Sequence, residues 1–368
     1  VKDGGFVVKD PDGGKLYAAR GYKTGDFYVY DIETNTWTAL PAAPAIIGKG
    51  GNGCYGNGYV YVMHGQNSAK FSRFNIAANS WEALPDIPPW TSGKNPKGGG
   101  DLAYAEVDGV PYVYVLKGYK QDFGRYNLVT GTWEELGQAP AGAKPKWDKG
   151  SWLTYDGVNT LYAHKAKYSE LWTFALDSSK WSSAALPGIP YPSTRTGKNK
   201  KPKDGSDGVY YNGFLYALKG GNTCEFWKYD ISGGTGWTEL DLIPEVGTTG
   251  KKKRVKNGGS LASNGDGAFF ALKGGKTREF WRYYEEPAPL VSVPERSGVM
   301  AEQTGSARFG FSVAPNPVVK GYGMLSYSVP QAGEAKVKVF DVTGRTVAEF
   351  GFVAQGTGTK SLDLRNLS

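Results

Sequence analysis

The hydrophobic and polar positions of the first 284 residues follow a plan that recurs six times. Each copy holds an apolar run that ends at Gly or Ala, and the runs are LYAARG (16–21), VYVMHG (60–65), VYVLKG (113–118), LYAHKA (161–166), LYALKG (215–220) and FALKG (270–274). Such runs are typical of a strand covered on both faces. A short strand and a tight turn precede each run, and an aromatic strand follows it.

The spacing of the copies predicts the architecture. A lysine opens each copy, and successive copies begin 47, 48, 52, 54 and 53 residues apart, at Lys2, Lys49, Lys97, Lys149, Lys203 and Lys256. In the first five copies an aromatic residue precedes a Trp by seven or eight positions, which adds a fourth strand. Four short strands per repeat without helical stretches predict an all-β fold with a six-bladed β-propeller. Scaffold roles are assigned to Trp37, Trp81, Trp133, Trp181, Trp237, Gly220, Gly221, Gly274 and Gly275.

The sixth copy has no Trp, so the last blade is one strand short. Two interpretations are open: residues 290–294 (LVSVP) fold back to complete it, or its edge stays free for another chain. We place the propeller at residues 1–289, a linker at 290–308 and a second, alternating segment at 309–368. That segment predicts a small antiparallel, immunoglobulin-like β-sandwich.

The composition gives the chain a net positive charge and indicates no membrane span or disulfide. The chain of 368 residues has a formal net charge of +8, which favours anionic partners. No run approaches the roughly 18 apolar residues that span a bilayer, and no signal peptide precedes Val1, so we expect a mature soluble chain. Cys54 and Cys224 fall in distant copies and predict two separate thiols.

Nothing in the sequence predicts an active site. The chain has two histidines, His64 and His164, and both are assigned structural roles. Zinc spacings, nucleophile elbows and EF-hand calcium loops are absent from the sequence. We therefore expect no enzyme, no cofactor and no metal site, and keep a polysaccharide-active enzyme as a weak alternative.

The distribution of charged residues over the two faces of the propeller predicts a binding surface. In a four-stranded blade, the connections between blades lie on one face together with the turns from second to third strand. That face is predicted to be basic and to bind anions or partners through Lys94, Lys97, Lys144, Lys146, Lys149, Lys198, Lys200, Lys201, Lys251, Lys252, Lys253 and Arg254, with Trp90, Trp147 and Tyr191 available to stack on sugar rings. The opposite face is predicted to be acidic through Asp10, Asp12, Asp31, Glu33, Glu106, Asp108, Asp156, Asp177, Asp230 and Asp266.

One further basic position recurs just before the Gly of each apolar run. Its residues are Arg20, His64, Lys117, Lys165, Lys219 and Lys273, and acids at the start of the third strand face them at Asp26, Asp122, Glu170, Glu225 and Glu279. Because the two strands are adjacent, we predict structural ion pairs between these positions.

These residues resemble the kelch family of β-propellers, in the Gly pairs at 220–221 and 274–275 and in the aromatic-to-Trp spacing. The pattern departs from the family in three ways: the pair reads Gly-Tyr at 21–22 and 118–119 and Gly-Gln at 65–66, the fourth copy has Lys165-Ala166, and the sixth copy lacks Trp. The resemblance implies a propeller fold and leaves the function open.

Residues 309–368 resemble the C-terminal sorting domain of the type IX secretion system. The resemblance rests on PNP (315–317), a strand that ends in SVP, VFDVTGRTV (339–347) and SLDLRNLS (361–368). It implies export by that machinery to the outer-membrane surface or the exterior of a diderm bacterium. The family continues with one more strand, so the sandwich is expected to lack its last strand.

Two functions follow as hypotheses. The first is a secreted, non-catalytic structural protein that assembles with copies of itself or with other cell-surface components through its polar faces and open strand edges. The second is an adhesin-like or lectin-like module that binds acidic polysaccharide or another polyanion at the lysine-rich face. We do not expect nucleic acid as a partner.

Overall fold

The computed structural model describes residues 1–10, 14–234, 236–247, 250–284, 310–314, 322–328, 332–340, 346–355 and 357–363. The chain divides into two units, Val1–Pro287 and Ala288–Ser368. Among the described residues, none lies in a helix long and apolar enough to cross a membrane. The two units are described separately.

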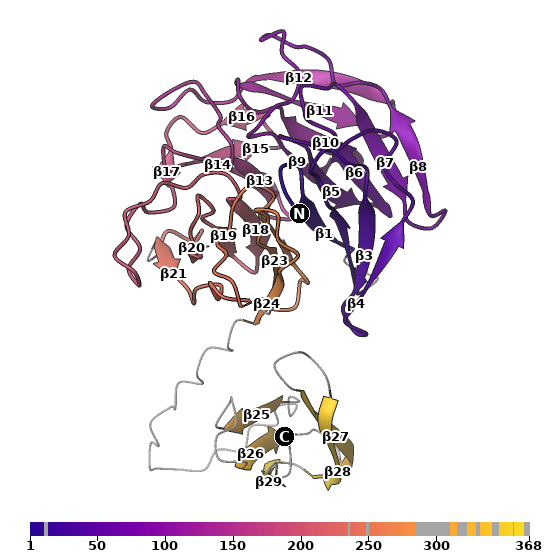
Figure 1. Ribbon diagram of the computed structural model, residues 1–368, viewed down its shortest axis with the longest axis vertical. Helices are drawn as coiled ribbons and strands as arrows, with labels where there is room; N and C mark the ends of the chain where they lie inside the picture. Colours follow the sequence, from indigo (N-terminus) through magenta and orange to yellow (C-terminus); the bar gives the residue numbers. More distant parts are fainter. Residues whose placement is uncertain are drawn as a thin grey trace. The chain divides into compact units, whose positions relative to one another are not determined.

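The first unit is a six-bladed β-propeller of antiparallel sheets (Figure 1). Blades 1 to 3 contain β1 (Phe6–Asp10), β2 (Lys15–Ala19), β3 (Phe27–Asp31), β4 (Thr36–Leu40); β5 (Asn52–Gly56), β6 (Tyr59–Met63), β7 (Phe71–Asn75), β8 (Ser80–Leu84); β9 (Asp101–Val107), β10 (Val110–Leu116), β11 (Asp122–Asn127) and β12 (Thr132–Gln138). Blades 4 to 6 contain β13 (Trp152–Tyr155), β14 (Thr160–Lys165), β15 (Glu170–Ala175), β16 (Lys180–Trp181), β17 (Leu186–Pro187); β18 (Asp207–Tyr211), β19 (Phe214–Leu218), β20 (Phe226–Asp230), β21 (Trp237–Glu239); β22 (Ser260–Ser263), β23 (Ala268–Leu272) and β24 (Phe280–Tyr284). The predicted blade number is therefore confirmed.

The core consists of six apolar clusters, and each one lies between two neighbouring blades. The second strands supply most of it, because both of their faces are covered, as their unbroken apolar sequence predicts. The ring closes between blades 6 and 1, where Val7 and Leu16 pack against Phe270 and Leu272. The Val7 amide also donates to Ser260 Oγ at 3.1 Å.

Three of the repeat tryptophans, Trp81, Trp133 and Trp237, are hydrogen-bonded to the preceding blade. The indole N–H of Trp81 donates to Pro41 O at 2.8 Å, and that of Trp133 donates to Pro85 O at 3.0 Å. Trp37 contacts blade 6 through Phe280, with 5.0 Å between the ring centroids, and its side chain is 41% exposed. The tryptophans are therefore scaffold residues on the outer strands, and they are only partly buried.

Blade 6 has three described strands, in the order β22, β23, β24. Residues 290–294, expected to complete this blade or to leave it open, lie outside the described residues. In the second unit, β25 (Gly310–Ala314), β26 (Tyr322–Ser328) and β29 (Thr357–Asp363) form one antiparallel sheet. A second sheet pairs β27 (Gly333–Phe340) with β28 (Thr346–Ala354). The motif at 315–317 lies outside the described residues, as do residues 341–345 of the motif at 339–347 and residues 364–368 of the motif at 361–368.

Candidate functional site: a basic face on preorganised loops

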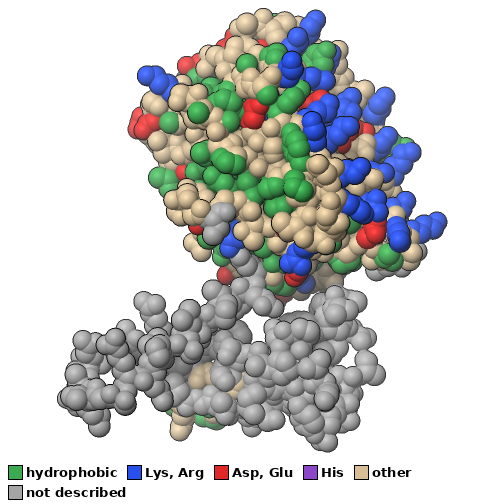
Figure 2. All heavy atoms as spheres, turned by 90° about the vertical axis from the view of Figure 1, so that its left-hand side faces the viewer, with side chains coloured by type: hydrophobic (Ala, Val, Ile, Leu, Met, Phe, Trp, Pro, Cys, Tyr) green, Lys and Arg blue, Asp and Glu red, His purple; other side chains and the backbone are tan. Residues whose placement is uncertain are grey.

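The loops between blades gather lysine and arginine side chains along one side of the propeller, as Figure 2 shows. Exposed lysines there form no ion pair with a described carboxylate, and they are Lys94, Lys144, Lys198, Lys200, Lys201, Lys251, Lys252 and Lys253. Others are paired: Lys146 with Asp148 at 3.4 Å, Lys149 with Asp204 at 3.3 Å and Arg254 with Glu245 at 2.5 Å. The face therefore keeps a surplus of solvated positive charge.

Beneath this face lies a layer of buried lysines. Lys117 pairs with Asp122 at 3.1 Å, Lys219 with Glu225 at 2.6 Å and Lys273 with Glu279 at 2.5 Å. Lys165 lies 3.8 Å from Glu170, and blade 1 repeats the pair on the surface between Arg20 and Asp26 at 2.7 Å. The predicted structural ion pairs are thus confirmed, although four of the lysines are far more buried than a strand end implies.

Each buried lysine also holds the loop that precedes its blade. Lys117 Nζ donates to Pro88 O at 2.9 Å and Pro89 O at 2.7 Å, and Lys219 Nζ donates to Tyr191 O at 2.7 Å. Lys165 Nζ donates to Pro140 O at 3.1 Å and Lys144 O at 2.5 Å. Burial lowers the pKa of Lys165 to about 8 and lowers the pKa of Lys117 and Lys219, whose neighbouring carboxylates oppose the shift.

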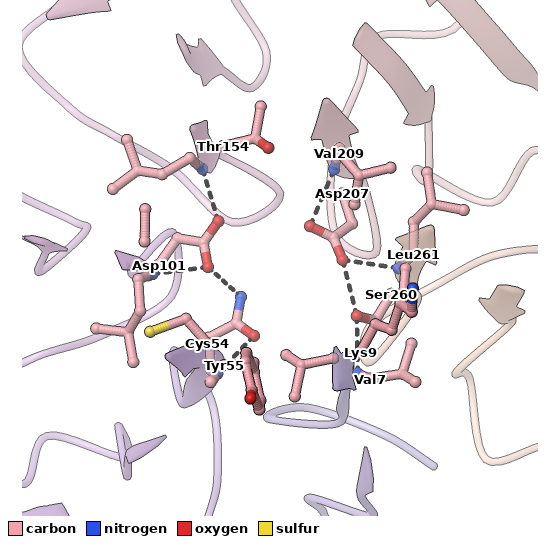
Figure 3. A pocket seen from close by; sticks show the side chains of 18 of the residues that line it. Val7, Lys9, Cys54, Tyr55, Asp101, Thr154, Asp207, Val209, Ser260 and Leu261 are labelled. Carbon is pink, nitrogen blue, oxygen red and sulfur yellow. Dashed lines mark hydrogen bonds between the residues drawn. The ribbon is translucent and has the colours of Figure 1, made fainter. Parts of the chain in front are cut away.

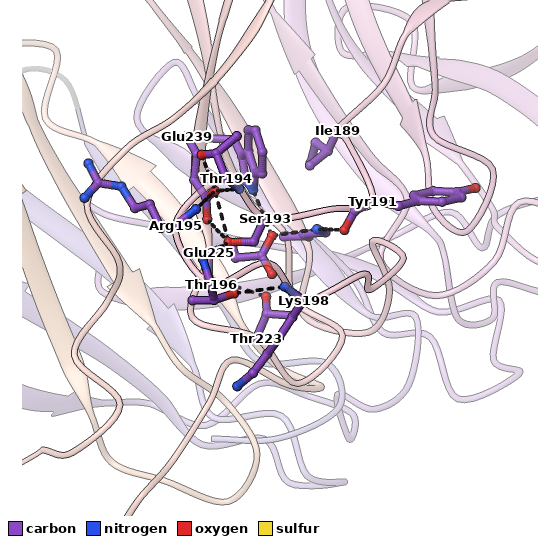
Figure 4. A network of polar contacts seen from close by, with 12 residues as sticks. Ile189, Tyr191, Ser193, Thr194, Arg195, Thr196, Lys198, Thr223, Glu225 and Glu239 are labelled. Atoms are coloured by element: carbon purple, nitrogen blue, oxygen red, sulfur yellow. Dashed lines mark hydrogen bonds and ion pairs between the residues drawn. The ribbon is translucent and has the colours of Figure 1, made fainter.

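Buried carboxylates fix the same loops from below. Glu239, 7% exposed, accepts hydrogen bonds from Ser193 Oγ at 2.8 Å and from the amides of Thr194 at 2.6 Å and Arg195 at 3.1 Å (Figure 4). In blade 3, Asp122 accepts from the Ser92 amide at 3.1 Å and its hydroxyl at 2.5 Å. Loops anchored in this way present their lysines without first having to become ordered.

The predicted stacking aromatics belong mainly to this buried layer. Trp147 is fully buried, and Lys165 Nζ lies 5.2 Å from its ring centroid. Trp90 packs against Trp133 and covers Lys117, with 5.0 Å between Nζ and the ring centroid. The prediction that Trp147 could stack on a sugar ring is therefore wrong, because the loop folds its indole inward. Tyr191 is half-buried, its hydroxyl donates to Lys167 O at 2.6 Å and Lys201 lies over its ring at 5.2 Å.

Among the described residues, the exposed aromatics on this face are Tyr22 and Tyr119, and neither is one of the predicted site residues. Tyr22 is 43% exposed and Tyr119 is 39% exposed. Lysines lie over both rings: Lys2 at 4.9 Å from the centroid of Tyr22, and Lys97 at 5.0 Å from that of Tyr119. In the sequence, each tyrosine follows the Gly that ends an apolar run, at the position where the fifth and sixth copies have a second Gly.

Several acids on the opposite face accept hydrogen bonds from backbone amides of their own turns. Asp31 accepts from the Thr34 amide at 2.9 Å, and Asp156 accepts from the amides of Val158, Asn159 and Thr160 at 2.9 to 3.0 Å. Asp230 accepts from the Ser232 amide at 2.9 Å. These acids stabilise turns between strands. Asp10 is buried, Glu33, Glu106, Asp108, Asp177 and Asp266 are exposed, and Asp12 lies outside the described residues.

The central channel is lined by the first strands and encloses a cavity of about 250 Å³ (Figure 3). Two buried carboxylates lie on its walls. Asp101 accepts from Asn52 Nδ2 at 2.5 Å and the Leu153 amide at 2.6 Å, and Asp207 accepts from Ser260 Oγ at 2.7 Å and the Leu261 amide at 2.8 Å. Each carboxylate joins the first strands of neighbouring blades, which is a structural role.

The buried environment raises the pKa of both carboxylates. Burial raises the pKa of Asp207 to about 6. Burial, with a contribution from Asp207, raises the pKa of Asp101 well above its ordinary value. Their backbone partners favour the ionised form but do not outweigh burial.

Both histidines and both cysteines have the surroundings of structural residues. His64 contacts Ala45 O at 3.1 Å and Ser72 Oγ at 2.8 Å, so it holds the preceding loop where other blades use lysine. His164 is fully buried and stacks on Trp152, and burial lowers its pKa to about 3. Cys54 and Cys224 are separate free thiols, as predicted.

Comparison with known proteins supports the fold alone. No protein family matches the sequence, and no curated protein matches it. The solved structure of YjhT is similar with a TM-score of 0.51 at 12% identity, over 74% of this chain and 90% of that one. A protein of unknown function from Bacteroides thetaiotaomicron is similar with a TM-score of 0.50 at 15% identity, over 73% of this chain and 66% of that one.

Proposed function

We propose that the propeller is a non-catalytic binding module that holds an acidic polysaccharide or another polyanion on its lysine-rich face. The observation that carries this proposal is the set of exposed, unpaired lysines on loops that buried lysines and carboxylates hold in place. A pocket of about 220 Å³ on the same face is lined by Lys252, Lys253, Arg254 and Lys256. Preorganised positive charge favours an anionic polymer because little conformational freedom is lost on binding.

The test compares equal charge removal on the two faces. Lys251→Ala with Lys253→Ala should elute from a polygalacturonate column at clearly lower salt than the wild type, because fewer counterions are displaced. Lys15→Ala with Lys180→Ala removes the same charge from exposed strand starts on the opposite face and should leave elution unchanged. Equal elution of all three proteins would reject the proposal.

Self-assembly is the second candidate, and the observation that favours it is the edge of β24, which no described strand covers. An exposed edge can accept a strand from another copy. The turn-stabilising roles of the acids give less support to stacking of opposite faces. Sedimentation and electron microscopy across protein and salt concentration test this candidate, and a monomer under all conditions would contradict it.

We further propose that the protein is a kelch-like propeller exported by the type IX secretion machinery and retained at, or released from, a bacterial cell surface. The sequence motifs at 315–317, 339–347 and 361–368 support this proposal. Inactivating this machinery in the bacterium that produces the protein should trap the protein in the periplasm. Unchanged export without the machinery would contradict the proposal.

A further inference from the structure

Two tyrosines on the basic face occupy a left-handed backbone position that blades 5 and 6 give to glycine, blade 2 to Gln66 and blade 4 to Lys167. The residue after the first Gly has φ of 60° at Tyr22 and 63° at Tyr119, and 61° and 60° at Gly221 and Gly275. A bulky residue is disfavoured in this left-handed region, whereas glycine adopts it freely. The fold alone does not need these rings, and strain of this kind is often retained where a side chain has a function.

Tyr119 stands among three lysines from three separate segments. The Nζ atoms of Lys97, Lys146 and Lys120 lie 5.0, 5.2 and 5.6 Å from its ring centroid. Lys97 precedes blade 3, Lys120 lies in the turn after β10, and Lys146 precedes blade 4. The backbone places the ring there, since the Tyr119 amide donates to Trp147 O at 2.6 Å.

The ring has no part in the apolar core. Within the described part of the chain, the ring of Tyr119 contacts the ammonium groups of Lys97, Lys120 and Lys146 and pairs with no aromatic ring. Lys97 and Lys120 form no ion pair with a described carboxylate, and Lys146 is 44% exposed although it pairs with Asp148. Tyr22 repeats the arrangement in blade 1 with Lys2 at 4.9 Å and Lys276 at 5.7 Å.

The geometry points to a binding subsite for a uronic acid unit of an acidic polysaccharide, formed by Tyr119 with Lys97, Lys120 and Lys146. The apolar C–H face of the sugar packs on the phenol ring, and the lysines exchange their contacts with the ring for the sugar carboxylate. Tyr22 with Lys2 and Lys276 forms a second subsite. This inference rests on the proposed polyanion binding and names the substrate class.

The arrangement suits a sugar acid better than a nucleotide. A uronic acid bears its carboxylate on the same ring that stacks, so cations gathered around one aromatic ring can reach it. In a nucleotide the phosphate is attached to the ribose, one sugar away from the base that would stack. Single-stranded nucleic acid is therefore a distinguishable outcome of the test.

The experiment measures binding of the full chain to polygalacturonate, polyphosphate and oligothymidylate at fixed salt. Tyr119→Gly should weaken polygalacturonate binding about tenfold, as the loss of one aromatic contact implies. Tyr119→Phe should retain binding because it keeps the ring. The matched control is Gln66→Gly, at the same position of blade 2 with φ of 56°, and it should bind as the wild type does. Polyphosphate binding should be equal in all four proteins.

Each contrary result has a separate meaning. If the wild type binds neither polygalacturonate nor polyphosphate, the proposed function fails and this inference fails with it. If the wild type binds polygalacturonate and Tyr119→Gly binds it equally well, the subsite is rejected, but the proposal that the basic face binds polyanions is retained. An equal loss for polyphosphate would reject sugar stacking. Oligothymidylate binding that is tighter and more dependent on Tyr119 would assign the site to nucleic acid instead.

Discussion

Two sets of lysines share one side of the propeller and have opposite surroundings. Lys117, Lys165, Lys219 and Lys273 are at most 1% exposed, and each meets a carboxylate and carbonyl oxygens. The loop lysines a short distance above, such as Lys198 and Lys251, are exposed and form no ion pair with a described acid. Lysines on the same face therefore have two different roles. The buried lysines hold the loops in place, and the exposed lysines are available to bind a ligand.

The largest effect is expected from breaking a buried pair. Lys219→Ala leaves Glu225 buried without its cation and frees Tyr191 O, so the free energy of unfolding should fall by about 3–5 kcal/mol. Urea denaturation measures this change. Lys251→Ala, a truncation in the exposed set, is the control, and a similar loss in both variants would remove the distinction between the two sets.

Buried carboxylates that have no cationic partner among the described residues make the stability of the propeller depend on pH. Because burial raises the pKa of Asp207 to about 6, the folded state binds this proton more tightly than the unfolded chain does. The stability from this group is complete below about pH 4 and is lost as pH rises to about 6, by up to about 3 kcal/mol. Denaturation of wild type and Asp207→Asn at pH 4 and pH 7 should show a smaller difference in the variant, and identical differences would contradict this prediction.

Removing exposed lysines should change binding without changing stability. Lys198→Ala, Lys200→Ala and Lys201→Ala together should alter the free energy of unfolding by no more than about 0.5 kcal/mol each, as expected of surface substitutions. The slope of log affinity for a polyanion against log salt should become shallower because fewer charges neutralise the ligand. A large fall in stability would show that these lysines belong to the buried layer.

The smallest effect concerns the strained tyrosine. Tyr119→Gly should leave the free energy of unfolding unchanged or raise it by up to about 1 kcal/mol, since relief of the left-handed backbone offsets the added freedom of the unfolded chain. Tyr119→Ala removes the ring but keeps the strain, and it should be the less stable of the two. If Tyr119→Gly is clearly destabilised, the ring supports the fold and its role as a free platform is lost.

Much of the architecture followed from local pattern. The apolar second strands and the repeat period predicted six blades, because a strand covered on both faces must be apolar throughout and one blade cannot cover itself. The pairing of Lys117 with Asp122 and of Lys219 with Glu225 was also predictable, since adjacent antiparallel strands set those positions side by side.

Other features depended on contacts between loops that are distant in sequence. The sequence placed Trp147 in a basic loop, but only the folded loop shows the indole buried over Lys165, and only the assembled face gathers Lys97, Lys120 and Lys146 around Tyr119. The sequence by itself determined which strands form and pair, because strand pattern and turn spacing are local. The tertiary structure decided which charges and rings remain in solvent, because burial depends on how neighbouring blades pack.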